Sequence, residues 1–365
     1  MRLYMKKIVS IVLAAAMLVC VFASCTKTPE NALVCKDADG KVTGSVDTKL
    51  YSLLTAVVNF QLGADSLSED MWDMQYQEGN DTTVRRIVIA QTKAYAKGLL
   101  QAEYLCDVSY KIGLSDEQKD SVDKYISTLV TSYGSQKALD GYLSSFGADV
   151  AALRRYMELV LKQNTLYESF YTEGGIRQEI VDAKKPSYFK EHFEIADHIL
   201  VKYSGGLKDD GTEIPITDEE KEAKREAAKA LYNEIVNGVR DFDEALEAYN
   251  DDTYKLGYPF GYFVPDSFYW TGISTDVQDA VNEMKAGEIR FVDTKDGAYI
   301  VRKNEMDETL FASNGNFETY IESTLAQEDF LEICEKSAAV EENEDIISQF
   351  DPALIPSFNI DALSK

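Results

Sequence analysis

The chain has 365 residues, of which 45% are hydrophobic and 27% are charged, as expected for a globular protein of two or three domains. Asp and Glu number 63 against 37 Lys and Arg, so the formal net charge is −26. This surplus of negative charge argues against binding to nucleic acid and against a basic patch that would hold an anionic membrane surface.

The first 24 residues have the pattern of a secretion signal. Basic residues lie within positions 2–7, and an apolar run follows over residues 8–22, which is too short to predict a membrane span. A Phe-Ala-Ser-Cys stretch at 22–25 resembles a bacterial lipobox. We therefore predict a signal peptide over residues 1–24 and lipidation of Cys25, which would anchor an extracytoplasmic lipoprotein to the cell membrane. The alternative is ordinary cleavage, with Cys25 incidental.

Residues 25–47 follow the predicted signal. They are polar and rich in Lys, Asp and Gly, and we predict a flexible tether that lifts the body of the protein off the membrane.

Helical patterns begin at Thr48, and we predict a helical N-terminal region over residues 48–187. Its first apolar stripe has the i, i+3, i+4, i+7 spacing of a helix face and consists of Leu50, Leu53, Leu54, Val57 and Val58. Ser115-Asp116-Glu117-Gln118 is a capping box that begins a later helix. Two interpretations remain open for this region, a cradle for unfolded client chains and a plain helical bundle.

Residues 188–305 carry the alternating strand and helix signals of a small α+β domain. Lys184-Lys185-Pro186 is predicted to be a linker, because proline biases the preceding residue out of the helix. An apolar strand follows over Phe193–Lys202. A capping box at Thr217–Glu220 begins a helix that Gly238 ends, and a loop rich in glycine and aromatic residues, a short helix and two strands come next. Residues 306–365 form a tail with one amphipathic helix over Phe317–Lys336.

The order and spacing of several short motifs between the first and last strands resemble a parvulin-type peptidyl-prolyl isomerase domain. The motifs are Ala196–Val201 with its histidine, Phe242–Leu246, Tyr249–Asp252, Gly261–Phe263, Asp279–Ala280 with Lys285–Ile289, and Gly297–Val301. The helices before them resemble the N-terminal region of SurA- and PrsA-type foldases. The resemblance implies an α+β fold with a four-stranded antiparallel sheet and flanking helices, and a C-terminal helix that packs back on the N-terminal region.

The resemblance also assigns three catalytic positions. His198 matches the first of two histidines that face each other across the sheet in the family. Tyr299 stands at the position of the second, and its phenol can still form a hydrogen bond with His198. Asp252 matches the Asp-or-Cys position beside the reacting carbonyl. His198 could instead be a hydrogen-bonded core residue, and Asp252 a helix-end or turn residue.

The same resemblance assigns the substrate-binding positions. Phe260, Ile273 and Val277 match the apolar positions that hold the proline ring, and Ile273 and Val277 are smaller than the usual Met and Phe. Phe263 belongs to an unusually aromatic loop, which core packing explains in part and a client-binding rim would explain for the rest. Asp296 falls where the family often has a small polar residue.

Isomerisation of a bond before proline has a barrier near 18–20 kcal/mol and needs no nucleophile, metal or cofactor. A thousandfold acceleration requires only about 4 kcal/mol of differential binding. We therefore predict no cofactor and no metal. Two histidines and five scattered cysteines give no usual zinc spacing, and the sequence has no phosphate loop or nucleophile elbow.

The favoured hypothesis is a membrane-anchored isomerase and chaperone that acts on unfolded or proline-containing secreted polypeptides and not on nucleic acid. The alternative is a catalytically weak or inactive holdase that only binds unfolded clients, and Tyr299 is the residue that favours it. A solute-binding lipoprotein is disfavoured because the sequence lacks paired α/β lobes. Acidic residues within the loop 208–213 predict no preference for phosphorylated clients.

Overall fold

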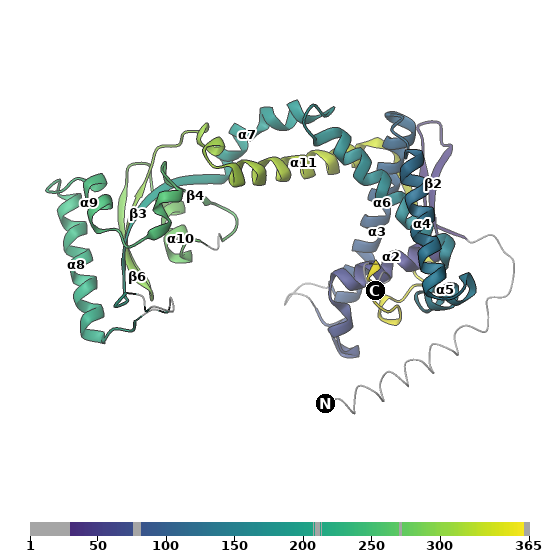
Figure 1. Cartoon of the computed structure of the whole chain (residues 1–365), viewed down its shortest axis with the longest axis horizontal. Coiled ribbons are helices and arrows are strands. Elements are labelled where there is room, and N and C mark those ends of the chain that lie inside the picture. The colour runs from purple at the N-terminus through teal and green to yellow at the C-terminus, as the bar shows by residue number, and fades with distance from the viewer. Residues whose placement is uncertain are drawn as a thin grey trace. The chain divides into compact units, whose positions relative to one another are not determined.

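The computed structural model describes residues 30–75, 82–206, 208, 212, 214–269 and 272–360 (Figure 1). The predicted signal peptide and Cys25 lie outside the described residues, as does most of the loop 208–213. Among the helices that are described, none has the length and apolar character that a membrane span requires.

The described chain divides into two compact units. The first consists of the residues up to Ile176 together with those from Glu328 onward, and the second consists of Arg177–Gln327. Each unit has its own sheet. The long helix α11, Gly315–Ser337, contributes residues to both units and closely matches the helix predicted over Phe317–Lys336.

The sheet of the first unit corrects the prediction of a flexible tether. Strands β1, Asn31–Lys36, and β2, Val42–Asp47, pair antiparallel, and β1 also pairs with β7, Ala339–Glu342. Leu33, Cys35 and Val46 are fully buried. The prediction was wrong because it gave the polar composition of residues 25–47 more weight than the short apolar alternation within them. The second partner of β1 lies some 300 residues away, beyond the reach of local patterns.

The first unit is otherwise helical, as predicted. Its helices are α2 Thr48–Gln61, α3 Val84–Tyr104, α4 Asp116–Ser132, α5 Gln136–Leu143, α6 Val150–Tyr171 and the short α12 Glu344–Ile347. The predicted capping box begins α4, where Ser115 and Gln118 exchange side-chain to backbone hydrogen bonds. Leu50, Leu53 and Leu54 on α2 are buried in the core of this unit.

The C-terminal helix α11 packs back on the N-terminal helices as predicted, with the Tyr171 hydroxyl of α6 donating to Asp329 at 2.7 Å.

The segment after α11 also packs on these helices. The buried Asn59 side chain on α2 donates hydrogen bonds to the carbonyls of Pro352 and Ile355 at 2.9 and 2.7 Å. The Phe358 ring meets the Phe146 ring edge-on with centroids 5.0 Å apart. The tail is therefore part of the first core.

The second unit contains the predicted four-stranded antiparallel sheet, in the order β4-β3-β6-β5. The strands are β3 Phe193–Lys202, β4 Tyr262–Pro265, β5 Ile289–Asp293 and β6 Gly297–Lys303. Helices α8, Asp218–Val236, and α9, Phe242–Tyr249, pack on one face, and α10, Thr275–Glu283, packs on the other (Figure 1). The second predicted capping box, at Thr217 and Glu220, begins α8.

The predicted linker at Lys184-Lys185-Pro186 is helical instead. It lies inside α7, Gln178–His192, which runs directly into β3. Proline removes one helical hydrogen bond. The side chains around it offset this loss, because buried Lys185 forms ion pairs with Asp182 and Glu322, and buried Phe189 packs on Phe193 and Phe317.

The β1–β2 hairpin gives a stability test. We expect Leu33→Ala to lower the free energy of unfolding by about 2–5 kcal/mol, since the side chain is fully buried in the first core. Val42→Ala, at an exposed position of the same hairpin, should change it by less than about 0.5 kcal/mol. Denaturant unfolding of both variants measures the difference. Equal, negligible effects would mean that this segment is a tether after all.

Candidate functional site

The alternation of side chains along β3 places His198 on the α10 face of the second sheet. Ala196 on the same face belongs to the apolar cluster with α10, whereas Ile199 belongs to the cluster with α8 and α9. In the strand register, His198 is opposite Val301 of β6. The imidazole thus lies above the side of the sheet that α10 covers.

The segment after α9 brings Asp252 to the same place. β4 pairs with β3 only over residues 193–196, so the following part of this strand edge is available to the loop. The Leu200 amide donates to the Asn250 side chain, Asp251 N–H donates to the Leu200 carbonyl, and the Lys202 amide donates to the Asp251 carboxylate, all at 2.8–2.9 Å. These bonds fix the loop along the strand.

His198 and Asp252 form a direct contact. Nε2 of His198 lies 2.9 Å from Oδ2 of Asp252, and the two side chains are only 7% and 9% exposed. Asp252 also accepts hydrogen bonds from the Tyr262 hydroxyl and, at 2.9 Å, from the Tyr254 amide. The contact places the predicted catalytic histidine and carboxylate side by side.

The electrostatics of Asp252 favour the ionised carboxylate. Burial alone would raise its pKa, but the hydrogen bonds from His198 and Tyr262 lower the pKa to about 2. The pKa of Tyr262 is raised by burial and by the neighbouring Asp252 carboxylate, so its hydroxyl stays protonated and donates. Because an ionised carboxylate only accepts, Nε2 of His198 carries a proton in this arrangement.

Aromatic rings surround the imidazole. The Tyr262 ring stacks on His198 with centroids 4.6 Å apart and planes 18° apart, and Tyr258 stacks on Tyr262 at 4.5 Å and 29°. Tyr299 meets His198 edge-on at 5.2 Å and 70°. Its pKa is raised by burial and by Asp252 and Asp296, which keeps the phenol neutral. His198 therefore packs against two aromatic rings, one stacked on it and one nearly perpendicular to it.

Comparison with known proteins identifies the second unit. Residues 184–306 match the family described as "PPIC-type PPIASE domain". The segment is a parvulin-type peptidyl-prolyl isomerase domain. The match begins in α7 and ends just after β6, so it covers the whole second sheet and all of the residues predicted for the site.

Three solved structures resemble the chain. Peptidylprolyl isomerase (PrsA) from Bacillus anthracis shares 18% identity at a TM-score of 0.24, covering 66% of this chain and 93% of its own. PrsA from Bacillus subtilis shares 16% at 0.25, covering 76% and 97%, and the foldase protein PrsA from Streptococcus pneumoniae shares 12% at 0.23, covering 72% and 91%. No significant match was found among the curated proteins compared.

One of the residues predicted to bind substrate in the isomerase domain lies elsewhere, and this prediction is corrected. Phe263 alternates with Tyr262 along β4 and packs against Phe189 and Phe317, away from His198. Val277 on α10 is only 2% exposed and lies in the apolar cluster that also holds Ile273 and Tyr299, so its contact with substrate stays a prediction. A strand residue's face depends on register, and a helix residue's depth depends on packing, and neither is visible in the motif.

The other predicted positions remain compatible with the surface around the site. Ile273 and Tyr299 are half-buried and pack on the α10 cluster that contains Val277. Phe260 is 52% exposed just before the Gly261 turn. Asp296 is exposed at the β5–β6 turn, close enough to affect the pKa of Tyr299. Their contacts with substrate stay predictions.

Tyr262 is the residue whose role sequence reasoning missed, although it lies within the Gly261–Phe263 motif. Its partner in the strand register is Ala196, two residues from His198, which puts its ring on the imidazole face. The preceding Gly261 has φ +100°, a conformation that favours glycine, and it turns the chain into β4. A Gly-Tyr pair at the start of a short strand was the available signal.

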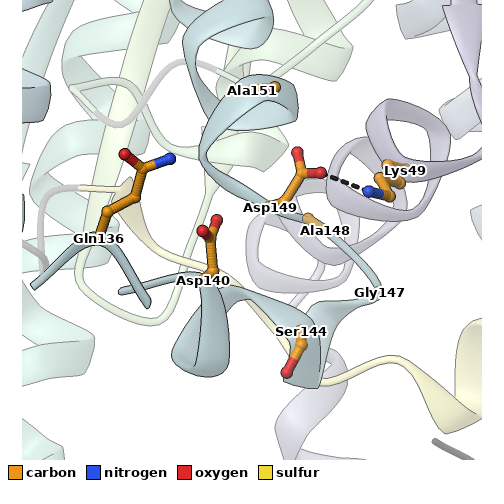
Figure 2. Close-up of a pocket in the computed structure, with 8 residues that line it drawn as sticks. All are labelled: Lys49, Gln136, Asp140, Ser144, Gly147, Ala148, Asp149 and Ala151. Atoms are coloured by element: carbon orange, nitrogen blue, oxygen red, sulfur yellow. Dashed lines mark hydrogen bonds and ion pairs between the residues drawn. The ribbon is translucent and has the colours of Figure 1, made fainter. Parts of the chain in front are cut away.

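The described part of the chain contains no cluster of three His, Cys, Asp or Glu side chains that could hold a metal ion. A cavity of about 530 Å³ opens in the first unit, lined by residues of α2, α5, the segment 144–149 and the start of α6. Figure 2 shows Lys49 paired with Asp149 there, with Asp140 nearby. None of its lining residues belongs to the isomerase domain.

The role of the Tyr262 hydroxyl can be tested by removing its oxygen atom alone. We expect Tyr262→Phe to keep the stacked ring but to raise the pKa of Asp252 from about 2 toward its ordinary value of 3.8. A ¹³C titration of the Asp252 carboxyl measures it. Tyr254→Phe, which removes a hydroxyl from an exposed ring in the same turn, should leave that pKa unchanged. An unchanged pKa in Tyr262→Phe would contradict the assigned hydrogen bond.

The depressed pKa of Asp252 also predicts how stability depends on pH. Because the folded-state pKa is below the unfolded value, the carboxylate contributes roughly 2 kcal/mol above about pH 4, and this contribution is lost as the pH falls toward 2. The difference in unfolding free energy between wild type and Asp252→Asn, measured from pH 7 to pH 2, should shrink over this range. A difference that stays constant with pH would contradict the prediction.

Proposed function

We propose that the chain catalyses cis–trans isomerisation of the peptide bonds before proline in unfolded polypeptides outside the cytoplasmic membrane. The observation that carries the proposal is the 2.9 Å contact between His198 and Asp252 inside a domain of the matching family. Both polar groups are held in a largely apolar setting of aromatic rings. Because isomerisation involves no covalent step, what the reaction requires is a largely apolar setting with a few fixed polar groups.

The chemistry assigned to the site is the stabilisation of a twisted amide. Rotation of the bond before proline breaks amide resonance, and lowering the barrier thousandfold takes about 4 kcal/mol. In the proposed pose the proline ring lies against the half-buried Ile273 and Tyr299, with exposed Phe260 beside them. The amide then turns next to the fixed Asp252 carboxylate and His198 N–H, which need no reorganisation during the reaction.

A chaperone role for the first unit is part of the proposal. Exposed apolar side chains recur from the end of α2 through the following turns, namely Phe60, Leu62, Met71 and Met74. Flexible, polarisable methionine side chains adapt to many partners. These residues would hold extended client segments. The clients would be secreted polypeptides, since the sequence begins with a signal pattern and carries Cys25 in a lipobox-like stretch.

The test is an isomerisation assay on the chain from residue 25 onward with an Xaa-Pro tetrapeptide. We expect clear acceleration over the uncatalysed rate and at least about tenfold lower kcat/KM in His198→Ala and in Asp252→Ala. His192→Ala is the matched control, because this second histidine lies at the end of α7 with a half-exposed side chain 3.8 Å from Asp266. A wild-type rate equal to the buffer rate would overturn the proposal.

A holdase without catalysis is the second candidate, and the position of Tyr299 favours it. Its ring edge contacts His198 where the family has a second imidazole. If tyrosine in place of the family's second histidine limits the rate, Tyr299→His should raise kcat/KM. Tyr299→Phe should lower kcat/KM no more than about threefold. A wild type that suppresses aggregation of an unfolded protein without accelerating isomerisation would establish the holdase.

A further inference from the structure

The turn that carries Asp252 is held to β3 at a second point. Lys255, three residues after Asp252, donates from Nζ to Oδ1 of Asp197 at 2.8 Å. Asp197 immediately precedes His198 in the strand, so the two side chains point to opposite faces of the sheet. The turn therefore contacts two consecutive residues of β3. Its Asp252 carboxylate meets His198 on one face of the sheet, and its Lys255 ammonium meets Asp197 on the other.

Asp197 is a buried anchor with fixed partners. Its Oδ2 accepts hydrogen bonds from Arg302 of β6 at 3.2 Å and from Asn304 at 2.9 Å, in addition to the bond from Lys255. The Arg302 guanidinium also pairs with Asp243 at the start of α9. Burial alone would raise the pKa of Asp197, but the hydrogen bonds from Lys255 and Asn304 lower it. The anchor is thus charged and tied to the sheet independently of Lys255.

Lys255 joins this anchor to the aromatic stack. Its Nζ makes a second hydrogen bond, at 2.9 Å, to the carbonyl of Tyr258, which also accepts from the Gly261 amide at 3.1 Å. The Tyr258 ring stacks on Tyr262, and Tyr262 stacks on His198. The Lys255 ammonium is therefore the connection between the buried carboxylate of Asp197 and the rings that enclose the imidazole.

We propose that Lys255, anchored on Asp197, is a positioning residue for the isomerase site, which fixes the 252–258 turn so that Asp252 and Tyr262 meet His198. The proposal rests on the proposed function. Lys255 itself is directed to the face opposite His198 and is not assigned a contact with substrate. It acts by removing freedom from the turn, and the same geometry then serves every turnover.

The test compares three variants of the chain from residue 25 onward. Lys255→Met keeps the apolar stem but removes both hydrogen bonds, and Lys255→Arg keeps a charged donor. Lys229→Met removes an exposed lysine of α8 that forms a 3.8 Å ion pair with Glu226. We expect Lys255→Met to lower kcat about tenfold with little change in KM. Lys255→Arg should recover most of the loss, and Lys229→Met should match wild type.

A second readout does not need catalysis. In Lys255→Met the ¹³C titration of the Asp252 carboxyl should shift toward the ordinary Asp value, because the His198 and Tyr262 hydrogen bonds become less populated. If Lys255→Met does not fold cooperatively, Lys255→Gln, which keeps a neutral donor, is measured in its place. An inactive wild type with a shifted titration in the variant would refute the proposed function and leave the positioning role standing.

Two results would overturn the positioning role. One is wild-type kcat together with a wild-type Asp252 titration in Lys255→Met. The other is equal impairment in Lys229→Met, which would trace the loss to general destabilisation of the isomerase domain.

Discussion

The hydrogen bond between His198 and Asp252 is the constraint on which the candidate site depends. It joins the second strand in the sheet order to a loop 54 residues further along the chain, and it is largely shielded from water. A buried carboxylate is costly unless it is hydrogen-bonded, and here three donors converge on it. Removing any of these donors would leave a buried charged or polar group without a hydrogen-bond partner. The energetic cost of that loss holds the site in this geometry.

The rest of the domain serves that contact. β4 ends its pairing with β3 at residue 196, which leaves the strand edge for the Asn250–Asp251 segment. α10 supplies the apolar support below Tyr299 and Tyr262, and α8 and α9 support the opposite face. The candidate site therefore lies where β3 stops pairing with β4 and begins to pair with the Asn250–Asp251 segment.

Local signals in the sequence were sufficient to predict much of the fold and of the candidate site. The capping boxes at Ser115 and Thr217 act through contacts three residues apart, so their helices could be predicted at their exact starts. The motif order located the isomerase domain and assigned His198 and Asp252 to its site. Features that depend on distant partners were not predictable. The pairing of β1 with β7, the helix through Pro186 and the face taken by Phe263 are all decided by packing between remote segments.

We propose that the surface beside His198 seats the proline of an unfolded chain. The most direct test is an NMR titration of the chain from residue 25 onward with an Ala-Pro tetrapeptide and with its Ala-Ala counterpart. The account predicts shifts at Ile273 and Tyr299 and cis–trans exchange peaks for the proline peptide, with much weaker effects for the counterpart. Equal responses to both peptides, or shifts confined to other parts of the molecule, would contradict it.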